Sequence, residues 1–242
     1  MSDAAIIGIG ETALGRLPGK TALQLQAEAA RAAIADAGLD FDEIDAVISL
    51  PMRTQPMMMP AAAIAHYLGI APDYLATLDL AGASGVALIQ AAAQALAAGA
   101  CRNVLCVTGQ NMLSHQSRAA AIRQMAEVGA AHPQFEVPYG PLIPSLYALV
   151  AQRHMHEFGT TREQMAEVAV TMRRHAGLNP NAHKREAITI ADVLHATPIT
   201  SPFGVLDCSL VSDGAGAAVV TTAERARDRP HRVVTALASA KA

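Results

Sequence analysis

The segment that most constrains this chain is an apolar run at residues 76–82 followed by an alanine-rich, uncharged run at residues 86–98. The first run predicts a strand that ends at Gly82, and the second predicts a helix that begins near Ser84. A sharp strand-to-helix turn aims backbone N–H groups and the positive end of the helix dipole at one point. Because the second run is apolar on all sides, we expect this helix to be buried on most of its faces.

Short β-branched runs alternate with helical runs along the chain, a pattern that is typical of a layered α/β fold. Thr21 and Thr161 each precede a glutamine by three residues, which predicts helices that begin with a capping box. Strands are predicted at residues 4–9, 46–50, 74–80, 103–108, 215–222 and 232–237. Further helices are predicted at residues 145–158, 189–192 and 223–229.

The composition excludes several classes of protein. The 242 residues are 52% hydrophobic and carry a net charge of −3, with no basic tract that suits a nucleic-acid backbone. Three cysteines, at positions 101, 106 and 208, have neither metal-ligand spacing nor an even disulfide set, which favours a reducing cytoplasm. We expect Cys106 and Cys208 to be core residues and Cys101 to be exposed. No signal peptide or stretch of about 20 apolar residues is present, so no membrane span is predicted.

Several motifs in register resemble the thiolase superfamily, and specifically its sterol-carrier-protein-type branch. The motifs lie at residues 6–12, 78–85, 104–109, 138–140, 153–160, 174–180 and 207–214. The resemblance implies an α/β domain with a five-stranded mixed sheet, helices on both faces and an inserted helical loop domain. It implies a core of residues 1–109 and 203–230, a loop domain of residues 110–202, and a first strand of an otherwise absent C-terminal domain at residues 231–242.

The resemblance also implies Claisen or retro-aldol chemistry on coenzyme A thioesters, with no permanently bound cofactor and no metal. Members of the superfamily use a cysteine at the head of the buried helix to take the acyl group. In this chain the family's Cys-Ala-Ser-Gly is Gly82-Ala83-Ser84-Gly85, so that thiol is absent. The family's second domain, with its histidine and second cysteine, is expected to be absent as well, since only residues 231–242 resemble its first strand.

Six residues are candidates for the site. Gly82 is either a tight turn that needs a residue without Cβ or a vacant nucleophile position. Ser84 is a possible replacement nucleophile, although a hydroxyl that caps the start of the helix is the favoured interpretation. Tyr139 is a conceivable proton donor, with a packing role as the alternative. Arg173, Arg174 and Lys184 form a basic stretch that suits the phosphates of coenzyme A, or else a solvated face.

Three functional hypotheses remain open. The chain is half of a thiolase-like acyltransferase or carbon–carbon lyase that is inactive alone, a non-catalytic acyl-CoA or lipid-binding module, or a structural partner of an intact paralogue. The partners implied are a second copy, a thiolase C-terminal half or a small OB-fold protein. The loop at residues 51–60, rich in methionine and proline, is expected to pack against such a partner.

Overall fold

The computed structural model describes residues 4–117, 120, 132, 134–139, 143–227 and 234–236. The chain divides into two compact units, Met1–His115 with Ser212–Ala242, and Gln116–Val211. The second unit is therefore inserted between two segments of the first.

A mixed six-stranded sheet forms the centre of the first unit, in the order β3-β2-β4-β7-β1-β8. The strands β2, β3 and β4 run parallel to one another, whereas β7 is antiparallel to β4 and β1. The strands are β1 (Ala4–Glu11), β2 (Ala46–Ser49), β3 (Tyr74–Thr77), β4 (Val104–Gln110), β7 (Gly214–Thr222) and β8 (Val234–Ala236). The expected mixed α/β architecture is confirmed, with six strands in place of five. The additional strand is β8, which pairs with β1, and the assignment of residues 231–242 to a second domain stays a prediction.

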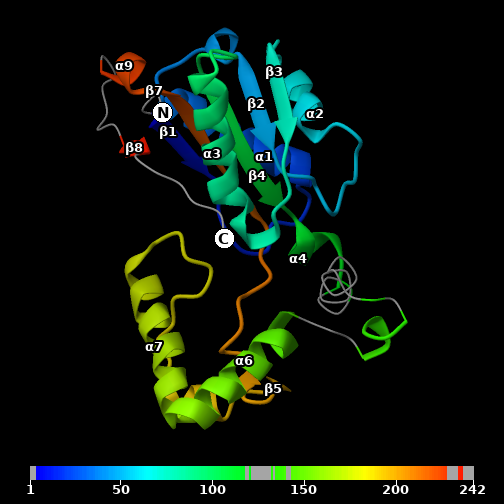
Figure 1. Cartoon of the computed structure of the whole chain (residues 1–242), viewed down its shortest axis with the longest axis vertical. Helices are drawn as coiled ribbons and strands as arrows, with labels where there is room; N and C mark the ends of the chain where they lie inside the picture. The colour runs from blue at the N-terminus through cyan, green and yellow to red at the C-terminus, as the bar shows by residue number, and fades with distance from the viewer. Residues whose placement is uncertain are drawn as a thin grey trace. The chain divides into compact units, whose positions relative to one another are not determined.

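Helices cover both faces of this sheet (Figure 1). On one face, α1 (Ala22–Asp36) and α2 (Pro60–Leu68) pack on the side chains of β1, β2, β4 and β7, and on the other face α3 (Ser84–Ala97) packs on β2 and β4. The short helices α4 (Met112–His115) and α9 (Ala223–Ala226) follow β4 and β7. The sequence analysis names no helix at Pro60–Leu68, because the preceding methionines and prolines hide its start.

The outer face of α3 differs from the expectation. Leu88, Ala92 and Leu96 are buried against the sheet, but Val86 is 71% exposed and Gly85 is exposed as well. The helix is thus buried on one face only in this chain, although it carries no charged residue on the other.

Small residues bring α1 unusually close to the sheet. A Cβ atom on Gly8 would lie 2.3 Å from the carbonyl oxygen of Ala33 and 2.5 Å from the amide nitrogen of Ala37. On Gly10 it would lie 2.3 Å from the carbonyl oxygen of Ala29. Since real Cβ atoms do not approach backbone atoms so closely, these glycines set the distance between the helix and β1.

The buried carboxylate of Asp213 ties three parts of the first unit together. Its Oδ2 accepts a hydrogen bond from the Leu17 N–H (2.8 Å), and its Oδ1 accepts from the N–H groups of Leu113 (2.7 Å) and Ser114 (3.1 Å). Burial alone would raise the pKa of Asp213, but these hydrogen bonds together hold the pKa below its ordinary value. The loop before α1, the start of α4 and the approach to β7 are therefore joined by one ionised side chain.

The second unit consists of helices and a two-stranded sheet. Its elements are η3 (Val137–Tyr139), α6 (Ile143–Phe158), α7 (Arg162–Leu178), α8 (Ile190–Leu194), β5 (Pro198–Thr200) and β6 (Phe203–Gly204). The predicted capping box at Thr161 opens α7, and Thr189 opens α8 in the same way. Arg162 at the start of α7 forms a two-pronged ion pair with Asp207, which also accepts a hydrogen bond from the Gly204 N–H (2.7 Å).

We expect Gly8→Ala to lower the free energy of unfolding by about 1–3 kcal/mol, the usual cost of overpacking a close-packed layer. The control is Gly82→Ala, because a Cβ at that position meets no atom within 4 Å. Urea unfolding should separate the two variants clearly. Equal stabilities would contradict the close approach of α1 to β1.

A pH series tests the role of Asp213. Asp213→Asn should cost about 2 kcal/mol at pH 7, since it removes the charge from hydrogen bonds to backbone N–H groups. Because the folded pKa lies below the unfolded value of about 3.9, this stabilisation is complete above the unfolded pKa and disappears as the pH falls through the folded one. The difference in unfolding free energy between the wild type and the variant should therefore shrink below about pH 4. A difference that stays constant down to acid pH would show that the ionised carboxylate contributes nothing.

Candidate functional site

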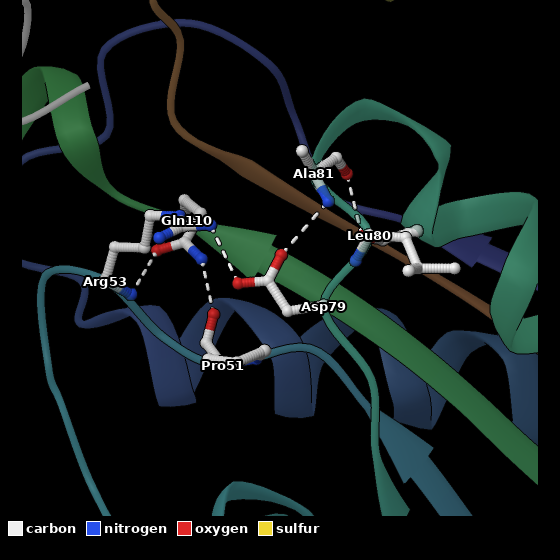
Figure 2. A network of polar contacts seen from close by, with 7 residues as sticks. Pro51, Arg53, Asp79, Leu80, Ala81 and Gln110 are labelled. Atoms are coloured by element: carbon white, nitrogen blue, oxygen red, sulfur yellow. Dashed lines mark hydrogen bonds and ion pairs between the residues drawn. The ribbon is translucent and has the colours of Figure 1, made fainter. Parts of the chain in front are cut away.

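The candidate site lies at the carboxyl ends of the parallel strands β3, β2 and β4, where ligands bind in many open α/β sheets. The loops after β2 and β3 and the end of β4 meet at this edge of the sheet. A network of polar contacts joins them (Figure 2).

Arg53 and Gln110 connect the β2 loop to its neighbours. The Gln110 side chain accepts a hydrogen bond from the Arg53 N–H (3.0 Å) and donates one to the Pro51 carbonyl (2.8 Å). The Arg53 guanidinium then forms an ion pair with Asp79 in the next loop, at 2.8 Å (Figure 2). An ion pair thus joins the loop after β2 to the loop that leads from β3 into α3.

Asp79 also holds the turn that leads into α3. Its Oδ1 accepts a hydrogen bond from the Ala81 N–H (3.1 Å), and Ala81 has a φ of +49°, in the left-handed region. A residue with a Cβ is strained there, so the surroundings must hold it in place. The sequence analysis missed both residues, because neither a left-handed alanine nor an Asp–Arg pair 26 positions apart leaves a local pattern.

Ser84 is 1% exposed, and its hydroxyl is engaged twice. It donates to the Ala81 carbonyl (2.7 Å) and accepts from the Leu80 N–H (2.8 Å). The hydroxyl therefore stabilises the turn before the helix, and not the first-turn N–H groups that a capping serine would bind. No side chain of the described residues caps the N-terminus of α3.

Gly82 is exposed at this N-terminus, in the short turn η2 (Ala81–Ala83). Its φ lies outside the left-handed region, and a Cβ added to it meets no atom within 4 Å. The strain of the turn falls on Ala81 instead. Among the described residues, glycine is thus not required here by conformation or by the space that a Cβ atom needs.

The three cysteines lack the character of nucleophiles. Burial, and then the neighbouring Cys101, raise the pKa of Cys106 to about 12, and burial, followed by Asp45, raises that of Cys101 to about 11. The pKa of Cys208 is raised by burial and Asp207. Cys106 is a core residue as expected, whereas the expected exposure of Cys101 is wrong, since it is buried beneath α3, and Cys208 is half-buried.

The second unit holds the other candidate residues. Tyr139 ends η3 and is 87% exposed. Arg173 and Lys184 line one pocket of about 620 Å³, together with His183. Arg174 is exposed and is not among the residues that line this pocket. The structure thus brings together two of the three cations proposed from the sequence.

Within the described part of the chain, no three His, Cys, Asp or Glu side chains converge so as to hold a metal ion. Among the same residues, no helix has both the length and the apolar character to cross a bilayer.

Comparison with known proteins gives the family. The family model described as "Thiolase, N-terminal domain" matches residues 3–224. An acetyl-CoA acetyltransferase of Methanothermobacter thermautotrophicus is 33% identical over 100% of this chain and 63% of its own length. A steroid side-chain-cleaving aldolase of Thermomonospora curvata is 36% identical over 94% of this chain and 59% of its own length.

Solved structures of related proteins have the same fold. The Ltp2-ChsH2(DUF35) aldolase superposes with a TM-score of 0.77 and 33% identity, over 96% of this chain and 58% of that chain. Human mitochondrial 3-ketoacyl-CoA thiolase in complex with CoA has a TM-score of 0.72 at 16% identity, over 93% of this chain and 66% of that chain, which shows a shared fold. This chain spans 59% to 63% of the length of the two curated relatives described. The family match and the fold together establish that the chain belongs to the thiolase superfamily, through its N-terminal domain.

Proposed function

We propose that this chain is the N-terminal half of a thiolase-like enzyme that cleaves a carbon–carbon bond next to a coenzyme A thioester. The observation that carries the proposal is the open Gly82 position at the uncapped N-terminus of α3. In this proposal the N-terminus of α3 stabilises a thioester oxygen through its positive dipole end and through the N–H groups that the turn does not use, since the N–H groups of Ala83 and Ser84 already donate to the Leu80 and Ala81 carbonyls. Position 82 itself carries no nucleophile.

The absence of a thiol at position 82 favours a lyase over an acyltransferase. Acyl transfer through the enzyme needs a thiolate, and the pKa values of all three cysteines are raised. A retro-aldol cleavage needs no acyl-enzyme: the β-hydroxyl loses its proton to a base, the bond between the α and β carbons breaks, and its electrons form an enolate. The helix N–H groups stabilise the enolate oxygen until the α carbon is protonated. Tyr139 is our candidate for a proton-transfer group in the second unit.

In this proposal, the other catalytic groups come from a second domain, equivalent to the part of the longer relatives that this chain does not match. They belong either to a longer form of the same polypeptide or to a separate chain, and this half alone is inactive. The edge strand β3, with the exposed Met58 and Met59 beside it, is our candidate surface for a second copy.

The three cysteines, none of them in a disulfide, fit a cytoplasmic location.

Coenzyme A thioesters are the proposed ligand class, with Arg173, Arg174 and Lys184 as candidates for the phosphates. A second candidate function, non-catalytic binding of acyl-CoA, rests on the same open position at Gly82. In that case the N–H groups hold the thioester carbonyl without any subsequent reaction.

An affinity purification from native extract, followed by mass spectrometry, tests the enzyme hypothesis. We expect the longer form or a stoichiometric partner with a thiolase C-terminal half, and the recovered assembly should shorten a β-hydroxyacyl-CoA. Recovery of this chain alone, with affinity for acyl-CoA but no turnover, would favour the binding function.

A cysteine placed at position 82 tests, without any ligand, whether the N-terminus of α3 stabilises negative charge there. The thiol introduced by Gly82→Cys should have a pKa clearly below the ordinary value of about 8.5, because the helix dipole stabilises the thiolate. The measurement is the rate of alkylation by iodoacetamide against pH, with the wild type as the background for the native cysteines. An ordinary thiol pKa would contradict the proposed stabilisation of negative charge at the N-terminus of α3.

The same thiol reports on Asp79. If only charge mattered, Asp79→Ala would lower the thiol pKa, because it removes a nearby negative charge. We expect a rise instead, since loss of the Ala81 hydrogen bond releases the turn and moves the thiol off the helix axis. Glu28→Ala, which removes an acid from an exposed ion pair on α1, should leave the pKa unchanged. A fall of the thiol pKa in Asp79→Ala would refute the positioning role.

A further inference from the structure

A pocket within the second unit has an apolar wall that the proposed function does not use. It has a volume of about 620 Å³, within the range of small-molecule sites. Its walls come from α7, from the segment at residues 182–188 and from residues 203–210, and we call it the α7 pocket.

One side of the α7 pocket is apolar. The side chains that form it are Met165, Val168, Met172, Phe203, Leu206 and Leu210. Val168 and Met172 are 65% and 62% exposed, although they lie on a long helix whose other faces carry charges. Unbranched methionines adapt to irregular apolar bodies, so this wall suits a flexible or polycyclic hydrocarbon.

Two cations also line the α7 pocket. Arg173, on the same face of α7 as Met165 and Met172, donates a hydrogen bond to the Glu186 carbonyl (3.1 Å), which orients its guanidinium, and Lys184 lines the pocket as well. The carboxylate of Asp207 is neutralised by its ion pair with Arg162. The Glu186 carboxylate, whose pKa is lowered by backbone hydrogen bonds and by both cations, offsets one of the two charges. Arg173 and Lys184 thus leave for a ligand a positive charge that Glu186 offsets only in part.

These features favour a singly charged apolar ligand over a nucleotide. A nucleotide carries several phosphate charges, and its base needs hydrogen-bonding partners. Asp207, the carboxylate in the pocket, is already engaged by Arg162 and the Gly204 N–H. We propose that the α7 pocket binds an apolar monocarboxylic acid, with the carboxylate on Arg173 and Lys184 and the hydrocarbon on the methionine wall. With Arg173 and Lys184 on a carboxylate, the coenzyme A phosphates would bind elsewhere, and the nucleotide in the test below distinguishes the two assignments.

Isothermal titration of the full chain with decanoate, decanol and adenosine 3′,5′-bisphosphate tests this proposal. We expect decanoate to bind, and decanol, which lacks the charge, to bind at least about tenfold more weakly. From hexanoate to decanoate, the affinity should rise by up to about fourfold for each added CH₂ group. The nucleotide should not displace decanoate.

Adjacent arginines provide the matched control. Arg173→Gln should weaken decanoate binding about tenfold, whereas Arg174→Gln removes the same charge outside the α7 pocket and should leave binding unchanged. Arg173→Lys, which keeps a cation, should retain most of the affinity if the glutamine variant unfolds. Equal binding of decanol and decanoate, equal loss in both glutamine variants, or binding of the nucleotide alone would each overturn the proposal.

Discussion

The close contact between α1 and the middle of the sheet is the constraint on which the rest of the first unit depends. Gly8 and Gly10 leave no room for a side chain, so the alanine face of α1 rests directly on the backbone of β1. Gln26 adds a polar anchor within this layer by donating to the Gly109 carbonyl of β4 (2.9 Å). With β1, β7 and β4 held by one helix, the parallel strands β2 and β3 extend from β4 and carry the loops of the candidate site.

The candidate site combines a turn held by several side chains with a glycine at its centre. Arg53, Asp79 and Ser84 hold Ala81 and the entry to α3, while position 82 is open and bears only hydrogen. A turn whose strain is maintained by an ion pair and two hydrogen bonds suits stabilisation of charge on a bound oxygen.

In the second unit, the helix face on which a charged side chain lies decides whether it lines the α7 pocket. Arg173 and Arg174 are adjacent in the sequence, but the 100° rotation per residue of an α-helix places only the first at the α7 pocket. The ion pair of Arg162 with Asp207 ties the start of α7 to the segment that forms the far wall. A basic stretch that looks continuous in the sequence is therefore divided between a pocket and a solvated face.

The sequence by itself determined the α/β class and the helices that begin at Thr21 and Thr161, because periodicity and capping are local. It also predicts a strand at residues 232–237, but not the pairing of that strand with β1. This pairing, the helix α2 and the burial of Cys101 depend on contacts across the fold and were not predicted. Only the tertiary structure placed Asp79 beside Arg53 and assigned the strain to Ala81. It also showed that, among the described residues, a Cβ atom at position 82 would meet no neighbour within 4 Å. Such features arise from contacts between loops of different strands, and no local pattern encodes them.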